Sequence, residues 1–242
     1  MRVSRCYVPQ ALSAGSTVRL EEASAHYLRD VLRLRQGAEL VVFNGEGGEY
    51  AAALVEVRKA AVCLALGEFN PREAESALHT HLGLGVSRGE RMDWAIQKAV
   101  ELGVSAMTPL FTERCVVQLD AARQVQRLRH WRGLAESACE QCGRNRVPVV
   151  FAPLPLADWV SRQTGLRLLL HPHGGLRLQE LPPPNGPVCL LSGPEGGFSD
   201  AERQDALAAG FVALRLGGRI LRTETAALAA LAAMQAVWGD LG

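Results

Sequence analysis

The chain has almost no lysine, no apolar run of membrane-spanning length and no sustained repeat. Lys59 and Lys98 are the only lysines among 26 lysine and arginine residues. The longest uncharged apolar stretch, residues 225–238, is shorter than the roughly 20 residues that a membrane-spanning helix needs. No triplet or heptad recurs, which excludes collagen-like and coiled-coil folds. The first residues lead into no apolar run typical of a secretory signal, so we expect a cytoplasmic protein.

The composition is that of a globular protein with two compact parts. The chain has 242 residues, of which 48% are hydrophobic and 21% charged, which is enough to bury a sizeable core. A net charge of +1 excludes a strongly basic protein that coats nucleic acid, but it is compatible with a local basic surface. The excess of arginine over lysine fits either genome composition or bidentate phosphate recognition.

Residues 1–70 read as a small β-rich domain, which we expect to be a barrel. One helix is predicted at residues 24–34, and the Asn70-Pro71 pair marks the domain boundary. The glycines of residues 44–48 supply the positive φ values that a hairpin turn needs. The strand-like runs are residues 3–9, 17–20, 38–43, 50–57 and 61–69.

Residues 71–242 change to an alternation of strands and helices. This alternation predicts an α/β domain with a mainly parallel sheet that is covered on both faces. The predicted strands are residues 78–86, 104–111, 147–151, 166–170, 188–192 and 211–216. The predicted helices are residues 93–102, 120–141, 199–209 and 223–238.

The glycine-rich stretch Ser192-Gly-Pro-Glu-Gly-Gly-Phe198 is the most informative motif. It follows an apolar strand and precedes a helix with a capping box, at the edge where open α/β sheets bind ligands. It matches neither a Walker loop nor a dinucleotide fingerprint. Glu195 would repel a phosphate, so it suits ribose, amide or ammonium groups; a tight turn without function is the alternative.

A second strand–glycine–helix passage spans residues 216–226. Ile220 and Leu221 lie between Arg219 and Arg222 and next to the Gly217-Gly218 pair. An apolar pair beside glycine backbone could hold an adenine ring. A surface loop with outward-facing arginines is the alternative here, and two such loops after two late strands favour a site.

Several basic residues are candidates for RNA contact. His26, Arg29 and Arg33 recur on one face of the first predicted helix, as a clamp for structured RNA would require. Arg88 follows one predicted strand, and Glu113 and Arg114 follow the next, so these could converge on one crevice. Arg144 belongs to a run of six arginines between residues 123 and 146. A solvated polar face explains each group equally well.

No metal site and no hydrolase triad is predicted. Cys139 and Cys142 lack a second Cys/His pair at matched spacing, so we interpret them as thiols on a helix that packs against the core. His171 and His173 have no carboxylate or cysteine at a spacing that would support metal binding.

Together these motifs resemble the bacterial 16S rRNA (uracil-N3)-methyltransferase family, a branch of the knotted SPOUT methyltransferases. The resemblance covers essentially the whole chain and is carried most specifically by residues 192–198 and 216–226. Residues 26–33, 97–103 and 140–144 are similar to further motifs of the family.

The resemblance implies a fold, a cofactor and roles for particular residues. It implies a PUA-like β-barrel for RNA and a SPOUT-type α/β domain whose end forms a trefoil knot, an exception to the rule of unknotted chains. S-adenosylmethionine would bind there as the cofactor of a homodimer that methylates N3 of a uridine in the decoding region of 16S rRNA, on the 30S subunit. Arg222 would stabilise the charge that develops on the base, and Glu195 would attract the sulfonium or accept the proton. The implied cofactor residues are Leu191, Gly193, Glu195, Gly196, Gly197, Leu216, Gly217, Ile220, Leu221 and Thr223.

Two other functions remain compatible with the sequence alone. A non-catalytic rRNA-binding or ribosome-assembly protein could use the same basic faces. An α/β enzyme acting on a nucleotide-like small molecule could use the same glycine loops.

Overall fold

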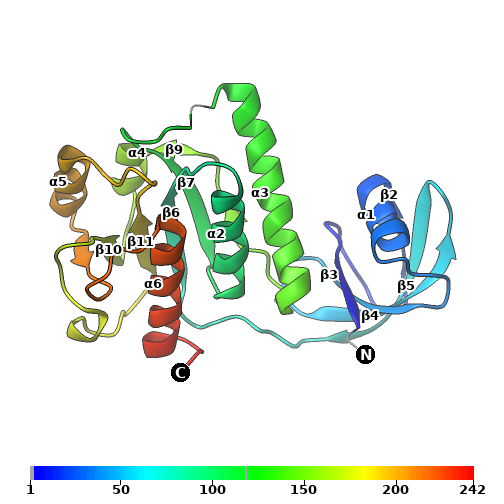
Figure 1. Cartoon of the computed structure of the whole chain (residues 1–242). Coiled ribbons are helices and arrows are strands. Elements are labelled where there is room, and N and C mark those ends of the chain that lie inside the picture. The colour runs from blue at the N-terminus through cyan, green and yellow to red at the C-terminus, as the bar shows by residue number, and fades with distance from the viewer. Residues whose placement is uncertain (1–2, 118) are drawn as a thin grey trace. The chain divides into compact units, whose positions relative to one another are not determined.

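The computed structural model describes residues 3–117 and 119–242, apart from the side chains of Glu22 and Ala23. The chain forms two compact units (Figure 1). The first unit comprises Met1–Glu75 and Cys139–Val147, and the second comprises Ser76–Ala138 and Pro148–Gly242. The first unit therefore extends to residue 75 and includes residues 139–147, which the sequence analysis assigned to the second domain.

The first unit is built on a curled five-stranded sheet, and all five of its predicted strands are present. The strand order is β1-β3-β4-β5-β2, with β1 parallel to β3 and the other pairs antiparallel. Alternate residues point into a core that includes Leu28, Leu54 and Leu64. Among the described residues no ladder joins β1 to β2, so the hydrogen-bonded sheet is open where a barrel would close. The strands are β1 (Ser4–Tyr7), β2 (Thr17–Glu21), β3 (Glu39–Phe43), β4 (Glu49–Val57) and β5 (Ala61–Asn70).

The helix of the first unit differs from the prediction. A short α1 (Glu22–His26) continues as a π-helix (Tyr27–Val31), and Arg33 then adopts a positive φ of 54°. The wider π turn changes the angular spacing of residues, and Arg33 lies beyond the helix end. The prediction that His26, Arg29 and Arg33 share one regular helical face is therefore wrong in its geometry.

Residues 139–147 are tied to the first unit by buried polar contacts. The backbone N–H of Tyr7 donates to Glu140 Oε1 at 2.9 Å, and Arg5 Nη2 donates to Asn145 Oδ1 at 2.5 Å. The Arg144 guanidinium pairs with Glu75 at 2.5 Å. These partners lie up to 140 positions apart in sequence, which is why the sequence could not place this segment.

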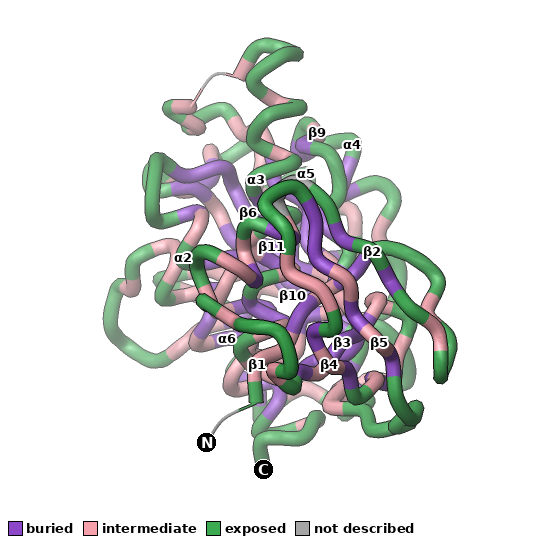
Figure 2. Tube along the Cα trace, turned by 90° about the vertical axis from the view of Figure 1, so that its right-hand side faces the viewer, coloured by how far each residue is buried: buried purple, intermediate pink, exposed green. Residues whose placement is uncertain are grey.

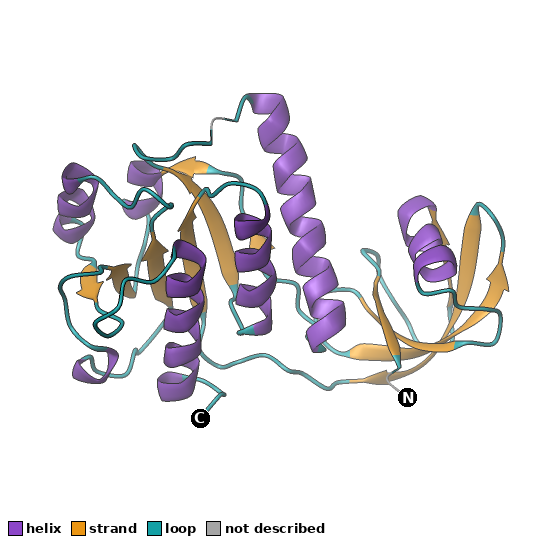
Figure 3. Ribbon diagram, in the orientation of Figure 1, coloured by secondary structure: helices purple, strands orange, loops and turns teal. Residues whose placement is uncertain are grey.

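The second unit contains a seven-stranded sheet (Figure 3), and its parallel pairing agrees with the prediction of a mainly parallel sheet, which had named six strands. The strand order is β12-β10-β11-β6-β7-β8, with β9 also paired to β7. β11 is buried along its whole length, which agrees with its uninterrupted apolar sequence. Figure 2 shows buried residues in both units, with the exposed ones mainly in turns and loops. The strands are β6 (Thr80–Gly85), β7 (Ala106–Phe111), β8 (Val149–Val150), β9 (Leu154–Pro155), β10 (Leu166–Leu170), β11 (Val188–Ser192) and β12 (Val212–Leu214).

Helices cover both faces of this sheet. α2 and α6 pack together on one face, whereas α4 and α5 pack together on the other, over a core that includes Trp159, Leu191 and Phe211 (Figure 1). The α5 N-terminus carries the predicted capping box of Ser199 and Glu202. The five-residue α4 and the two-residue β9 were not predicted, because elements this short show no periodicity. The helices are α2 (Glu90–Glu101), α3 (Ala121–Cys142), α4 (Leu156–Val160), α5 (Asp200–Ala208), α6 (Thr223–Trp238) and a 3₁₀ turn (Leu178–Glu180).

The described part of the chain contains no helix long and apolar enough to cross a membrane. All six cysteines are free thiols, and Cys6, Cys139 and Cys189 are buried. Within residues 3–117 and 119–242 no group of three or more His, Cys, Asp or Glu side chains is arranged to hold a metal ion.

Candidate functional site

The pocket that both glycine motifs line, called the main pocket below, lies in the second unit at the carboxyl ends of three neighbouring strands. Its walls come from the segments that follow β10, β11 and β12, which are adjacent in the sheet. Its volume of about 400 Å³ falls within the roughly 300–1,000 Å³ typical of small-molecule sites. The pocket thus forms at the edge of the sheet where the two glycine motifs were expected to meet.

The first glycine loop, residues 193–197, packs closely on the sheet. A Cβ atom at Gly85, the last residue of β6, would stand 2.4 Å from the backbone nitrogen of Pro194. Only glycine permits this approach. From the outside, Arg114 Nη1 donates to the carbonyl of Gly196 at 3.3 Å, and Arg203 Nη1 donates to the carbonyl of Phe198 at 3.0 Å. The loop is therefore held in place by the surrounding residues.

Glu195 connects this loop to the segment after β6. Its Oε1 accepts hydrogen bonds from the backbone N–H of Arg88 at 3.1 Å and from Arg91 Nη1 at 3.3 Å. Burial alone raises the pKa of Glu195, but these hydrogen bonds and the Arg91 charge outweigh burial and hold the pKa below its ordinary value. The carboxylate is therefore ionised at neutral pH and lines the pocket as a negative charge.

The second glycine loop, residues 215–222, supplies the apolar wall. Gly217 has a φ of +72°, which side chains rarely adopt, and nothing lies within 4 Å of the position of its missing Cβ. Ile220 lines the pocket with 74% of its surface exposed. An aliphatic side chain so exposed at a pocket mouth offers contact area to a ligand.

Most of the predicted cofactor residues line this one pocket. The two that do not are Leu191, which is fully buried in β11, and Gly217, which shapes the loop from outside the lining. The lining residues that the prediction included are Gly193, Glu195, Gly196, Gly197, Leu216, Ile220, Leu221 and Thr223. Arg222, predicted to be catalytic, is exposed between two lining residues, and its side chain has no hydrogen bond or ion pair among the described residues.

Sequence reasoning missed the wall that follows β10. Residues 170–173 line the pocket, including His171 and His173, which the sequence analysis considered only as metal ligands. The His173 backbone N–H donates to His171 Nδ1 at 3.2 Å, so the two histidines form a local turn. A signal was available, because these residues directly follow a predicted strand in the same way as the two glycine motifs.

The residues predicted to bind RNA fall into different environments. Arg114 lines the main pocket, and Arg88 contacts it through its backbone bond to Glu195. Glu113 does not reach this pocket and lines a separate one beside α4 and α5. The prediction that all three converge on one crevice is therefore wrong, since only Arg114 lines this pocket, Arg88 lies next to it and Glu113 lines another.

In the first unit, some of the basic residues predicted to contact RNA are already paired with acidic side chains. His26 and Arg29 both pair with Asp30, and the Arg29 hydrogen bond is the main reason that the pKa of Asp30 falls to about 2. Arg33 is exposed without a partner among the described residues. Arg144 is only 5% exposed and its guanidinium binds Glu75, so burial leaves it unsuited to the RNA contact that was predicted.

Comparisons with known proteins agree with this architecture. A family model described as an RNA methyltransferase domain matches residues 74–235, and one described as an RNA methyltransferase PUA domain matches residues 20–66. The curated ribosomal RNA small subunit methyltransferase E of Buchnera aphidicola from Schizaphis graminum is 35% identical over 242 residues, covering 99% of this chain and 98% of the relative.

Two solved structures share the fold over their full lengths. A putative methyltransferase from Legionella pneumophila, in complex with its bound cofactor SAM, is 39% identical with a TM-score of 0.97 and 100% coverage of both chains. The ribosomal RNA small subunit methyltransferase E of Neisseria gonorrhoeae, bound to S-adenosyl methionine, is 38% identical with a TM-score of 0.93 and the same coverage. The chain therefore belongs to the ribosomal RNA small subunit methyltransferase E family.

Proposed function

We propose that this protein transfers the methyl group of S-adenosylmethionine to N3 of a uridine in the decoding region of small-subunit rRNA. The observation that carries the proposal is the pocket at the carboxyl ends of β10, β11 and β12, in a chain whose full-length relatives hold this cofactor. A non-catalytic RNA-binding protein would have no need for such a pocket.

The residues of the pocket fit the chemical parts of S-adenosylmethionine. Leu216, Ile220 and Leu221 provide an apolar wall for a purine ring. The ionised carboxylate of Glu195 suits a sulfonium, and the guanidinium groups of Arg203 and Arg219 suit a carboxylate. When bound, the cofactor supplies a methyl group on a positively charged sulfur.

The chain must present the acceptor nitrogen in line and stabilise the base as it loses its N3 proton. N3 lies on the pairing edge of uracil, so the base has to leave its stack before it reacts. Arg222 is free of protein partners at the rim of the pocket, and its guanidinium can stabilise the negative charge that develops on O2 or O4. Glu195 acts by attracting the sulfonium, because its lowered pKa makes it a weak proton acceptor.

We also propose the features that the family resemblance implies for topology and assembly. The segment that follows β12 forms a trefoil knot, the enzyme acts as a homodimer in the cytoplasm, and its substrate is the 30S subunit. Exposed apolar residues on α2 and near the end of α6, including Trp94, Val237 and Leu241, supply surface for a second copy. Light scattering of the purified protein at micromolar concentration gives the mass that tests the dimer.

A pair of substitutions tests the central proposal. Ile220→Asp places a charge on the exposed apolar wall and should weaken S-adenosylmethionine binding in calorimetry at least tenfold. Leu207→Asp changes an exposed leucine on α5 outside the pocket and should leave binding unchanged. Transfer of a labelled methyl group to 30S subunits, followed by mass spectrometry of the nucleosides, should yield N3-methyluridine. RNA binding without any methyl transfer would refute the proposal.

A further inference from the structure

We propose that a second, smaller pocket beside the cofactor pocket receives a phosphate of the RNA backbone. This inference rests on the proposed function, since it assigns a place to part of the RNA substrate. The pocket has a volume of about 200 Å³ and lies between the segment after β6, the first turn of α2 and the side of α3. Its polar lining residues are Ser87, Arg88, Arg127 and Trp131.

The charge of this anion pocket is entirely positive. Arg88 and Arg127 line it with exposed guanidinium groups, and neither has an ion pair in the described part of the chain. None of its lining residues is acidic. The acidic side chain of Asp93 on α2 is turned to His130, 2.8 Å away, and does not line the pocket. Two unpaired guanidinium groups at one pocket attract an anion and bind its oxygens in a bidentate manner.

Two further kinds of hydrogen-bond donor lie at this pocket. Gly89, with a φ of 55°, is the residue before α2 and supplies no side-chain cap, so the first N–H groups of this 12-residue helix remain open. Trp131 is 2% exposed, and its Nε1–H has no acceptor among the described residues. A buried donor without an acceptor is uncommon in folded proteins.

This pattern of donors distinguishes a phosphate from a base. The pairing edge of uracil presents one donor between two acceptors, so a uracil pocket needs at least one protein acceptor. A phosphate presents acceptors only, which matches a pocket whose charged and N–H groups are all donors. The Ser87 hydroxyl gives its proton to the carbonyl of Gly85 at 3.3 Å, so the donors available to a ligand are the two guanidinium groups, the Trp131 Nε1–H and the first N–H groups of α2.

The position of the anion pocket indicates which phosphate it binds. Arg88 lines it, while the backbone N–H of the same residue donates to Glu195, which lines the cofactor pocket. One hydrogen bond thus separates the walls of the two pockets. A phosphate held here lies close to the reacting nucleotide and anchors the strand from which the uridine is displaced.

Arg127→Gln tests the inference, with Arg129→Gln as the matched control. Both arginines are exposed on α3, but only Arg127 lines the anion pocket. Binding of a full-length small-subunit rRNA transcript is measured over a range of salt concentrations. Arg127→Gln should weaken it about tenfold and lower the slope of log K against log salt by about 1. Arg127→Lys should recover most of the slope, and Arg129→Gln should change the affinity less than twofold.

Kinetics on the same variants complete the test. Arg127→Gln should raise KM for RNA by a similar factor and leave KM for S-adenosylmethionine unchanged. Equal effects of Arg127→Gln and Arg129→Gln on affinity and salt slope would overturn the anion pocket in favour of a diffuse basic face. Absence of methyl transfer by the wild type would instead refute the proposed function, and the binding measurement would still decide the pocket.

Discussion

Two arginines of the first unit and two near the pockets of the second unit have opposite environments. Arg144 is buried and the Arg5 side chain is only 10% exposed, and they bind Glu75 and Glu49 of the same unit. Arg127 and Arg222 are exposed, and their side chains have no partner among the described residues. Arginine content alone therefore does not indicate RNA binding. Burial and a carboxylate partner identify the guanidinium groups that hold the fold, and the absence of both identifies those that remain available to a ligand.

The largest expected effect is on stability, and it distinguishes two arginines that are two positions apart in the sequence. Arg144→Ala removes the buried partner of the Glu75 carboxylate, which is itself only 20% exposed, and should lower the free energy of unfolding by about 3 kcal/mol. Arg146→Ala removes a half-exposed pair with Glu73 at 3.4 Å, and should cost about 1 kcal/mol or less. Urea unfolding of both variants measures the difference. Similar losses would mean that burial does not distinguish the two arginines.

Arg222→Gln should show the reverse behaviour, with a large effect on catalysis and almost none on stability. Loss of a donor that stabilises developing charge lowers kcat by about 10²–10³. Because Arg222 is exposed and unpartnered, the free energy of unfolding should change by about 0.5 kcal/mol or less. Arg219→Gln, at the wall of the cofactor pocket, should instead raise KM for S-adenosylmethionine. An unchanged kcat in Arg222→Gln would remove Arg222 from the mechanism.

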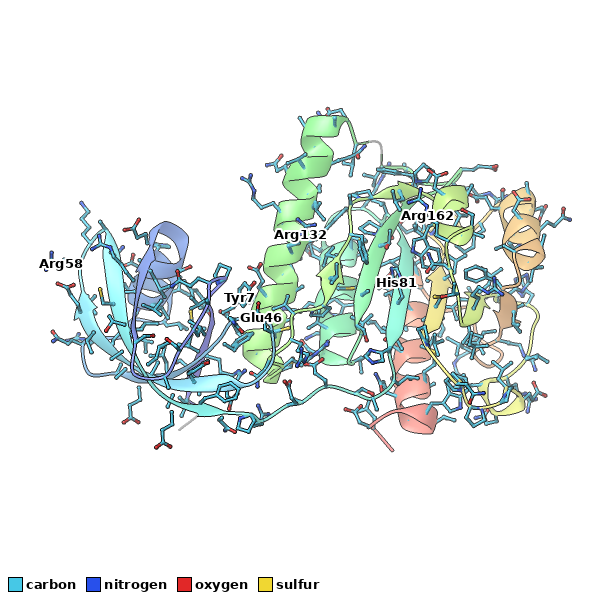
Figure 4. The ribbon with its side chains drawn as sticks, turned by 180° about the vertical axis from the view of Figure 1, so that it is seen from behind. Tyr7, Glu46, Arg58, His81, Arg132 and Arg162 are labelled. Carbon is cyan, nitrogen blue, oxygen red and sulfur yellow. The ribbon has the colours of Figure 1, made fainter. Side chains whose placement is uncertain are left out.

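His81 extends the contrast to a partly buried side chain that stays neutral in the folded protein. It lies on β6 (Figure 4), and its Nε2 contacts Thr108 Oγ1 at 2.8 Å beside the rings of Phe151 and Trp159. Burial lowers the pKa of His81 to about 4. As the pH falls, the His81 imidazole is therefore protonated near pH 6.5 in the unfolded chain but only near pH 4 in the folded chain.

This difference makes a prediction about the pH dependence of stability. The contribution of His81 is fully present above about pH 6.5 and is lost as the pH falls towards 4, by a total of about 3 kcal/mol. His81→Gln cannot titrate and should lack this part of the decline. Unfolding free energies of both proteins between pH 4 and 7 measure it. Parallel curves would show that His81 has no depressed pKa.

The smallest effect is expected where a charged pair is half-exposed. A double-mutant cycle of Arg91→Gln and Glu195→Gln should give a coupling free energy of about 1 kcal/mol or less. Because the pKa of Glu195 is lowered, this coupling is present at neutral pH and is lost as the pH falls through that lowered value. KM for S-adenosylmethionine should rise only a few-fold in Glu195→Gln. A loss of activity as large as that of Arg222→Gln would give Glu195 a direct catalytic role.

The elements that follow from local patterns were predictable from the sequence. The apolar run of β11 and the capping box at Ser199 are local signals, and the structure has both where they were expected. The two glycine motifs also meet at one pocket, because parallel strands bring their carboxyl ends to the same edge.

Features that depend on distant partners were not predictable. Glu75 pairs with Arg144 across 69 positions, and no local pattern identifies that arginine as buried. The π-helix at Tyr27–Val31 also escaped prediction, because its positions were assigned at the ordinary helical period. His171 and His173 were considered for metal binding but not as pocket residues, although they end a strand between two others that carry glycine motifs.

The sequence by itself determined the order of the longer strands and helices, the family and two of the loops that line the proposed cofactor pocket. These properties depend on residue types at fixed spacing along the chain, because such patterns set the local backbone conformation. Only the tertiary structure decided which arginines are buried beside a carboxylate and which remain free for a ligand. A guanidinium is charged in both environments, and its role depends on the residues that folding brings to it from elsewhere in the chain.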